Sequence, residues 1–224
     1  IGADGMFSNT RSFFEKKKNE PKFKKAIAVR KILKAKLELD INDEKISLMM
    51  GKKCHLVLYP INKKKELNLV CVIRDKKNNI SNLKYLMDRV IIQNPKLEKV
   101  FSEDLKSWPL YSTPRILQSN NDKVFYIGDA FNGFLPTLAQ GAGQSIESAY
   151  ELFNLLKEEK KDIQNRYFKE RSRRAKIVRK RSDINFFIFH FSSTIMQKIR
   201  NYFIKFLVKK KIIISSYLGV VYKN

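Results

Sequence analysis

Two short segments place a carboxylate and several glycines where an expected strand gives way to an expected helix. Gly128–Ala130, with the letters Gly-Asp-Ala, follows the apolar run Val124–Ile127, and Gln140–Gly143 opens a helical pattern. A carboxylate accepts hydrogen bonds from hydroxyls, glycines let a ligand approach the backbone, and a helix N-terminus offers free N–H groups. This chemistry suits a cofactor with a polyol and an electron-rich ring. An aspartate before a turn and a glycine-rich helix cap are the alternative interpretation.

Three apolar runs predict the strands that support these segments. Ala26–Leu33 alternates as a strand does, and Cys54–Ile61 and Glu66–Ile73 are rich in strand-forming residues. The charged stretch Asn62–Lys65 between the last two is typical of a hairpin connection.

Four segments have apolar residues at helical spacing. They run from an N-cap at Ser81 to a stop at Pro95, from about Gly141 to Glu159, over Ile163–Arg181 and over Ile195–Val208. Each of two helices carries a large apolar face, made respectively of Ile146, Ala149, Tyr150 and Phe153, and of Ile195, Ile199, Tyr202, Phe203 and Phe206. Strands and helices are interspersed, which predicts an α/β (mixed α+β) class.

Composition excludes several classes of protein. Of the 224 residues, 43% are hydrophobic, and there are only two cysteines and two histidines. These numbers exclude a disordered tail, a disulfide scaffold and a cysteine-rich zinc module, so we expect no metal site. The net charge of +24 invites a nucleic-acid interpretation, but no nucleic-acid-binding motif accompanies it and AT-rich codons also favour lysine. We expect solvated surface charge, no nucleic-acid partner and a cytoplasmic location.

Longer stretches around these segments resemble a known family. Val124–Ala130 followed by Phe134–Ala149 is similar to the second FAD-binding motif of flavin-dependent aromatic hydroxylases with the para-hydroxybenzoate hydroxylase fold, and Ile1–Arg11 resembles their Asp-Gly motif. Gly51–Ile61 and Ser107–Tyr111 are similar to segments of the salicylate-hydroxylase-like branch. Tyr167, Arg171, Arg174, Val178, Ser182, Asn185 and His190 resemble the C-terminal helical stretch of that branch.

The resemblance implies a two-domain flavoprotein hydroxylase, of which this chain is the C-terminal part. It implies the end of an FAD-binding domain over 1–20, a β-sheet substrate domain over 21–115, a returning FAD-binding segment over 116–180 and a helical tail over 181–224. The implied reaction hydroxylates a phenol or aromatic acid with FAD, NAD(P)H and O2 through a flavin C4a-hydroperoxide. The implied cofactor-binding residues are Asp4, Gly5, Arg11, Gly128, Asp129, Gln140, Gly141, Ala142 and Gly143.

The resemblance also implies individual roles. Asp129 binds the ribityl chain, Pro136 lies over the isoalloxazine, and Asp4 bonds the cofactor or ties down its own loop. Arg11 serves a nucleotide phosphate or an internal ion pair. His55 and Tyr59 share one face of a strand that borders the substrate, where a histidine accepts a phenol proton or binds a carboxylate. A satisfied strand histidine and a packing tyrosine are the alternatives, and for His190 we expect a packing role.

Two departures from the family pattern stand out. Phe131–Gly133 replaces the usual Ala-His-Pro, which puts catalytic competence in doubt. No Gly-x-Gly-x-x-Gly segment is present, so we expect the dinucleotide-binding half to lie upstream and this chain alone to hold FAD weakly.

Other functions remain open from the sequence. The fold also suits a polyprenyl-phenol hydroxylase of the ubiquinone-pathway type, with the basic stretch Ile195–Lys211 on a membrane surface, although we favour a tail helix docked on its own domain. A non-catalytic nucleic-acid-binding or scaffold fragment is a further alternative.

Overall fold

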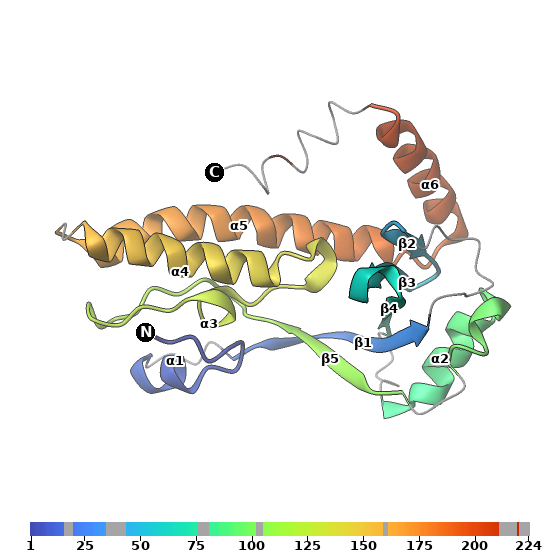
Figure 1. Cartoon of the computed structure of the whole chain (residues 1–224), viewed down its shortest axis with the longest axis horizontal. Helices are drawn as coiled ribbons and strands as arrows, with labels where there is room; N and C mark the ends of the chain where they lie inside the picture. Colours follow the sequence, from blue (N-terminus) through green and yellow to red (C-terminus); the bar gives the residue numbers. More distant parts are fainter. Residues whose placement is uncertain are drawn as a thin grey trace. The chain divides into compact units, whose positions relative to one another are not determined.

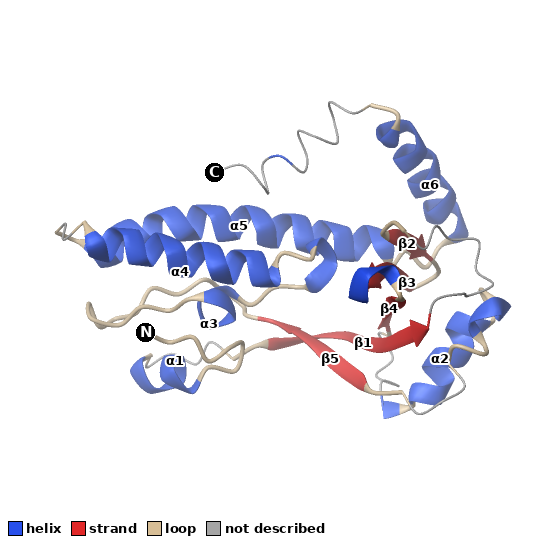
Figure 2. Ribbon diagram, in the orientation of Figure 1, coloured by secondary structure: helices blue, strands red, loops and turns tan. Residues whose placement is uncertain are grey.

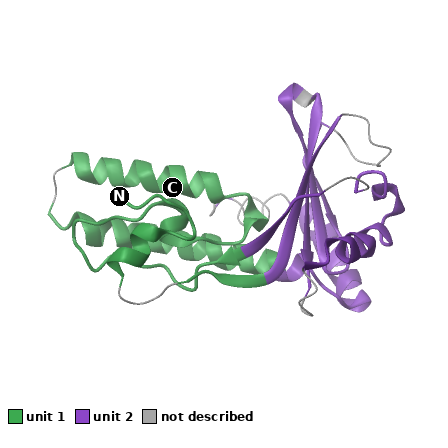
Figure 3. Cartoon of the chain, turned by 90° about the horizontal axis from the view of Figure 1, so that it is seen from below, with its two compact units in different colours: residues 1–24, 111–186, 220–224 green, residues 25–110, 187–219 purple. Residues whose placement is uncertain are grey.

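The computed structural model describes residues 1–15, 20–34, 44–75, 81–101, 105–158, 161–210 and 219 (Figure 1). They form two compact units, one of Ile1–Lys24 with Tyr111–Phe186 and one of Lys25–Leu110 with Phe187–Gly219 (Figure 3). The strands are β1 (Lys22–Lys34), β2 (Ser47–Met50), β3 (Cys54–Ile61), β4 (Glu66–Arg74) and β5 (Ser107–Ser112). The α-helices are α1 (Asn9–Phe14), α2 (Leu83–Ile91), α3 (Gly128–Asn132), α4 (Gly141–Lys157), α5 (Ile163–Phe189) and α6 (Thr194–Val208).

The strands form a five-stranded sheet in the order β2-β3-β4-β1-β5 (Figure 2). β2, β3, β4 and β1 pair antiparallel, and the β3–β4 register sets Leu56 opposite Cys71 and Leu58 opposite Leu69. Because side chains alternate along a strand, these residues share one face of the sheet. That face forms the main core of the second unit with Leu86, Met87 and Val90 of α2. His55, Val57 and Tyr59 therefore lie on the opposite face.

The first unit is built around a short parallel contact between two segments that are far apart in the sequence. Gly2 bridges Tyr126, with the Gly2 N–H donating to the Phe125 carbonyl at 2.7 Å and the Ile127 N–H donating to the Gly2 carbonyl at 3.0 Å. Tyr126 is buried together with Ala130, Phe131 and Leu152. The two expected motifs thus begin from adjacent, parallel extended segments, and the residues that follow both segments lie at the same end of this parallel pair.

Most expected elements are present, with shifted ends. β3 occupies the predicted residues, whereas β1 and β4 extend beyond their predicted limits. α2 is capped by Asn82, whose side chain accepts the Tyr85 N–H, and not by Ser81. α5 continues eight residues past the predicted end at Arg181, to Phe189. The short elements α1, β2, α3 and β5 were not predicted.

The two large apolar helix faces are exposed. In α4 the buried residues are Gln144, Ser148, Leu152 and Leu155, while Ile146, Tyr150 and Phe153 are exposed. In α6 the only fully buried residue is Arg200. No described helix has the length and apolar character needed to cross a membrane.

The units also group the chain differently from the four expected segments. The end of the second expected segment, 111–115, belongs with the first unit, as do residues 181–186. The expected helical tail, 181–224, is thus divided, and its part Phe187–Gly219 groups with the sheet.

Candidate functional site

Asp4 organises the loop that follows the first extended segment. Its carboxylate accepts hydrogen bonds from the Ser8 hydroxyl, from the Thr10 N–H at 2.9 Å and from the Thr10 hydroxyl at 3.0 Å. Burial alone raises the pKa of this carboxyl, but the bonds from Ser8 and Thr10 outweigh it and lower the pKa of Asp4 to about 2. Ser8 in turn caps α1. Asp4 therefore ties down its own loop, the second of its two expected roles.

Arg11 joins the two motif loops. Its buried guanidinium donates to the Ala130 carbonyl at 2.6 Å and to the Met6 carbonyl at 2.7 Å. Burial lowers the pKa of Arg11, which nevertheless stays charged. Both acceptors are backbone carbonyls, and the two expected roles, a phosphate contact and an internal ion pair, stay predictions. Arg11 fixes the position of Ala130, next to Asp129.

Gly128 fits a position that excludes a side chain. Its φ is +58°, and a Cβ there would lie 2.7 Å from the Ser145 hydroxyl oxygen of α4. Its N–H donates to the Ser148 hydroxyl at 3.1 Å. The glycine thus allows α3 to start directly against the first turns of α4, and this contact sets where Asp129 stands.

Asp129 has a half-buried carboxylate whose oxygens can accept hydrogen bonds from a ligand. Among the described residues it has no hydrogen-bond or ion-pair partner, and burial raises its pKa. A desolvated carboxylate is costly when it lacks donors, so this position favours a ligand that supplies hydroxyl or N–H groups.

The N-terminus of α4 is open. No side chain caps it, and the first helical N–H with a protein acceptor in the described chain is that of Gln144, which donates to the Gln140 carbonyl at 2.8 Å. A Cβ placed on Gly141 meets nothing within 4 Å. Ala139, just before the helix, has a left-handed φ of 53°. The amides of Gly141, Ala142 and Gly143 are therefore available to an electron-rich group.

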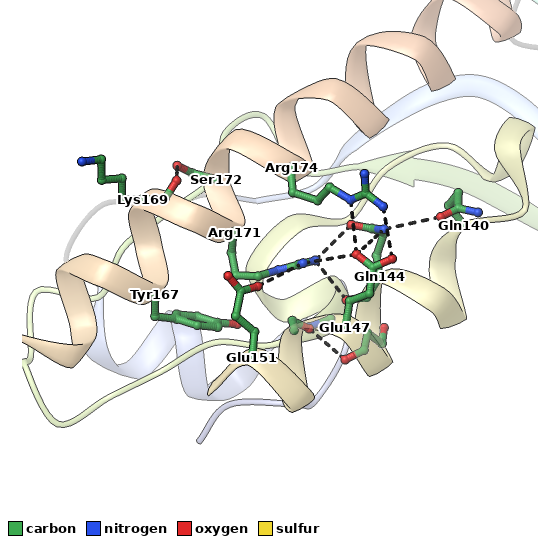
Figure 4. Close-up of polar contacts among 12 residues, drawn as sticks. Gln140, Gln144, Glu147, Glu151, Tyr167, Lys169, Arg171, Ser172 and Arg174 are labelled. Carbon is green, nitrogen blue, oxygen red and sulfur yellow. Dashed lines mark hydrogen bonds and ion pairs between the residues drawn. The ribbon is translucent and has the colours of Figure 1, made fainter. Parts of the chain in front are cut away.

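A polar network on one side of α4 holds this end of the helix against α5 (Figure 4). The Arg171 guanidinium donates to the Gln144 side-chain oxygen at 3.0 Å and contacts Glu147 at 3.3 Å and Glu151 at 3.2 Å. Arg174 contacts Glu147 at 3.3 Å. The network fixes the rotation of α4 and thereby the direction of its N-terminal amides.

The loop that carries Pro136 is attached to α5. Ser182 donates its hydroxyl to the Leu135 carbonyl, and Thr137 donates to the Ser182 carbonyl at 2.7 Å. Leu135 is buried and Pro136 is exposed. These bonds attach the loop to α5 and leave the proline ring exposed.

The departure at Phe131–Gly133 has a structural explanation. Phe131 packs in the core beside Tyr167 and Phe168. Asn132 accepts a hydrogen bond from Arg179, and the Gly133 carbonyl accepts from the Thr113 N–H at 2.9 Å. The segment is thus anchored internally, and Asp129 is placed ahead of it.

In the second unit, His55 is buried against His190. The His55 side chain is 3% exposed, and its Nδ1 lies 3.1 Å from Nε2 of His190. Burial and the neighbouring His190 lower the pKa of His55 to about 3. The His55 ring is therefore neutral near pH 7, and one ring nitrogen of the pair donates to the other. Tyr59, on the same face of the sheet, is only half-buried.

Two positioning residues escaped the sequence analysis. Arg179 donates to the Thr113 hydroxyl at 2.7 Å and also to Asn132. The Glu147 carboxylate forms ion pairs with both Arg171 and Arg174. Their pairing depends on contacts between distant segments, for which the sequence offers only a general helical pattern.

The donor and acceptor set of the first unit fits the expected flavin. Asp129 offers an unpaired acceptor for hydroxyls, and the open mouth of α4 offers amides and positive charge for the ring edge. Pro136, a few residues before Gly141 in the sequence, has an exposed apolar ring. Asp4 and Arg11 are occupied by internal bonds, so in this structure they support the loops.

Sequence comparisons identify the family. The squalene epoxidase family model matches residues 1–221. The FAD-dependent monooxygenase cfoG of Aspergillus candidus is 38% identical over 92 residues, which are 38% of this chain and 21% of that protein. The chain thus corresponds to only part of this relative.

Comparisons of structure identify the fold. HpxO of Klebsiella pneumoniae in complex with FAD and uric acid matches with a TM-score of 0.83 at 14% identity, covering 99% of this chain and 59% of that one. A salicylate hydroxylase substrate complex matches with a TM-score of 0.68 at 19% identity, covering 86% and 55%. The fold is that of flavoprotein hydroxylases. The match over nearly the whole sequence shows that the chain belongs to the squalene epoxidase family.

Proposed function

We propose that the chain forms the isoalloxazine-binding and substrate-facing part of an FAD-dependent monooxygenase that hydroxylates a small aromatic compound with NAD(P)H and O2. The observation that carries this proposal is the unpartnered, half-buried carboxylate of Asp129 in the first turn of α3, which packs against α4, whose N-terminus is open. When bound, the flavin supplies the redox chemistry that no protein side chain provides.

The residues of this chain bind the flavin and orient it. Asp129 accepts hydrogen bonds from ribityl hydroxyls, and the amides at Gly141–Gly143 stabilise negative charge on the ring edge. Pro136 packs against the ring, held by the Ser182 and Thr137 bonds. Arg11 and Asp4 keep the two motif loops in register.

We assign substrate contact to the sheet face that carries Val57 and Tyr59, both half-buried. His55 lies on this face, but its Nδ1 is engaged by His190. Its role in this proposal is to position β3, and proton transfer to a phenol falls to a group that solvent or substrate can reach. Uric acid in HpxO and the substrate in salicylate hydroxylase are the precedents for a small ring compound.

Riboflavin tests the site, because it contains the ring and the ribityl chain without the adenosine half. We expect titration with riboflavin to shift the amide NMR resonances of Gly141, Ala142 and Gly143. Asp129→Asn should weaken this binding about tenfold, since it removes the negative charge and replaces one acceptor oxygen with a donor. Asp122→Asn, which removes an exposed carboxylate of the same unit, should leave it unchanged. Equal affinities for all three proteins would overturn the assignment.

A further inference from the structure

Arg30 lies on the sheet face that is opposite the main core of the second unit. β1 pairs Arg30 with Val70 of β4, and β4 pairs Val70 with Val57 of β3. Because directly opposite residues of an antiparallel pair point to the same side of the sheet, these three side chains form one row across the face. Val57 and Val70 are half-buried and Arg30 is exposed. A guanidinium therefore lies beside an apolar floor.

Two further rows flank the row of Arg30. One is open to solvent, with residues that are half-buried or exposed, and consists of Ile32, Asn68 and Tyr59. The other is buried and consists of Ala28, Val72 and His55. Phe189 and His190 pack on the His55 ring and cover that row. The row of Arg30 and the row of Tyr59 therefore form a short open surface, which we call the open rows.

The charge of Arg30 is not compensated within the described part of the chain. Its guanidinium has no hydrogen-bond or ion-pair partner there. The only acidic residue of β1, β3 and β4 is Glu66, which lies opposite Lys34, four residues along β1 from Arg30. At the rise of an antiparallel strand this separation is about 13 Å. Arg30 therefore gives the open rows a positive charge that a ligand can neutralise.

The neighbouring cation of β1 has a different environment. Lys31 points to the other side of the sheet and donates to the Val100 carbonyl at 2.9 Å. Its ammonium is therefore occupied by the protein itself, whereas the guanidinium of Arg30 is available.

Because the proposed function, on which this assignment rests, places substrate contact on this face, we propose that Arg30 binds the carboxylate of a small aromatic acid whose ring lies on Val57 and Val70. The planar fork of a guanidinium matches a carboxylate through two parallel hydrogen bonds, and an apolar floor suits the ring. A neutral phenol would leave the charge of Arg30 unmatched. Arg30 is thus a specificity-determining residue, and the substrate it selects is anionic.

Titration of the full chain with benzoate at pH 7 tests the proposal. The NMR resonances of the Arg30 Nε–H group and of the Val57 and Val70 amides report on the binding surface. Benzamide has the same ring and shape without the charge, and we expect benzoate to bind at least about fivefold more tightly. Acetate, an anion without a ring, should bind at least about tenfold more weakly than benzoate.

Variants of β1 and β4 separate the charge from the floor. Arg30→Gln should reduce the preference for benzoate over benzamide to within about twofold, while Arg30→Lys keeps the charge without the fork and should retain part of it. Lys34→Gln is the matched control, because Lys34 is exposed on the same strand and face but lies opposite Glu66, and it should keep the full preference. Val70→Ser should weaken benzoate and benzamide about equally, because it removes apolar floor.

Three results would overturn the proposal: no binding of benzoate, equal affinities for benzoate and benzamide, or an equal loss of preference in Arg30→Gln and Lys34→Gln. Riboflavin titration of the same samples separates this role of Arg30 from the proposed function. Riboflavin binding without a preference for benzoate would overturn the role of Arg30 alone. A preference for benzoate without riboflavin binding would support the anion site and overturn the flavin assignment.

Discussion

Gly128 and Gly141 belong to the same glycine-rich pattern but differ in what surrounds them. A Cβ at Gly128 meets the Ser145 hydroxyl at 2.7 Å in a left-handed backbone, whereas a Cβ at Gly141 meets nothing within 4 Å. We expect Gly128→Ala to lower the free energy of unfolding by about 2 kcal/mol. Gly141→Ala should change it by less than about 0.5 kcal/mol. Denaturant unfolding measures both, and equal effects would contradict the distinction between a packed and an open glycine.

His55 makes stability depend on pH. Its pKa is lowered by burial, and by His190, to about 3. The unfolded chain takes up a proton near the ordinary pKa of 6.5, so His55 contributes stability above that pH, which is lost as the pH falls toward 3. We expect His55→Gln to remove on the order of 1 kcal/mol of the loss between pH 7 and pH 5. Tyr59→Phe on the same strand should keep the full loss. An unchanged slope in His55→Gln would mean that folding does not shift the pKa of His55, which contradicts the prediction.

The sequence indicated the chemistry at 129 and 141 better than the residues that position it. Gly128 and Asp129 stand together in the chain, so their motif is visible directly. Arg11 bonds the Ala130 carbonyl across 119 positions, and a guanidinium that seeks a backbone carbonyl leaves no pattern in the sequence. His55 and His190 are 135 positions apart, and only the fold shows that they satisfy each other.

At the scale of elements, strands were predicted more accurately than helix faces. β3 and β4 alternate in the way that pairing requires, and an antiparallel hairpin needs only neighbouring segments. In α4 the apolar face was identified correctly, but the structure buries Gln144 and Ser148 and exposes Tyr150. Periodicity finds a face but cannot say which face is covered when the polar side forms a buried network with Arg171.

The seam between α4 and α5 should weaken as the pH rises. Burial, together with a hydrogen bond to Glu170, raises the pKa of Glu151 to about 7 against the lowering effect of Arg171. Because the folded pKa exceeds the ordinary 4.5, this group contributes stability that is complete below pH 4.5 and is lost as the pH rises through 7. We expect Glu151→Gln to raise the free energy of unfolding at pH 8 relative to wild type by about 1 kcal/mol, with little gain at pH 5. Glu158→Gln, at an exposed position, serves as the control. If the His55→Gln protein, which keeps Glu151, has the same free energy of unfolding from pH 5 to pH 8, the prediction is wrong.

At the scale of the molecule, the sequence motifs predicted the fold class but not the division into units. β1 starts in one unit and continues in the other, and α5 does the same at its C-terminal end. Boundaries inside continuous elements leave no turn or linker in the sequence. The resemblance did predict the flavoprotein hydroxylase fold. In this fold the segments that carry the two motifs meet through the Gly2–Tyr126 contact.

The chain as a whole should recognise one half of FAD. Its unpaired acceptor and open helix mouth suit the ring and the ribityl chain, whereas the sequence has no Gly-x-Gly-x-x-Gly turn for the pyrophosphate. We therefore expect the dissociation constants of FAD and riboflavin, measured by flavin fluorescence, to agree within about threefold, because the adenosine and pyrophosphate add little to binding. Asp129→Asn should weaken both equally, and purified protein should carry no stoichiometric flavin absorbance. Affinity for FAD at least about a hundredfold tighter than for riboflavin would contradict this, since it would require a pyrophosphate site within the chain itself.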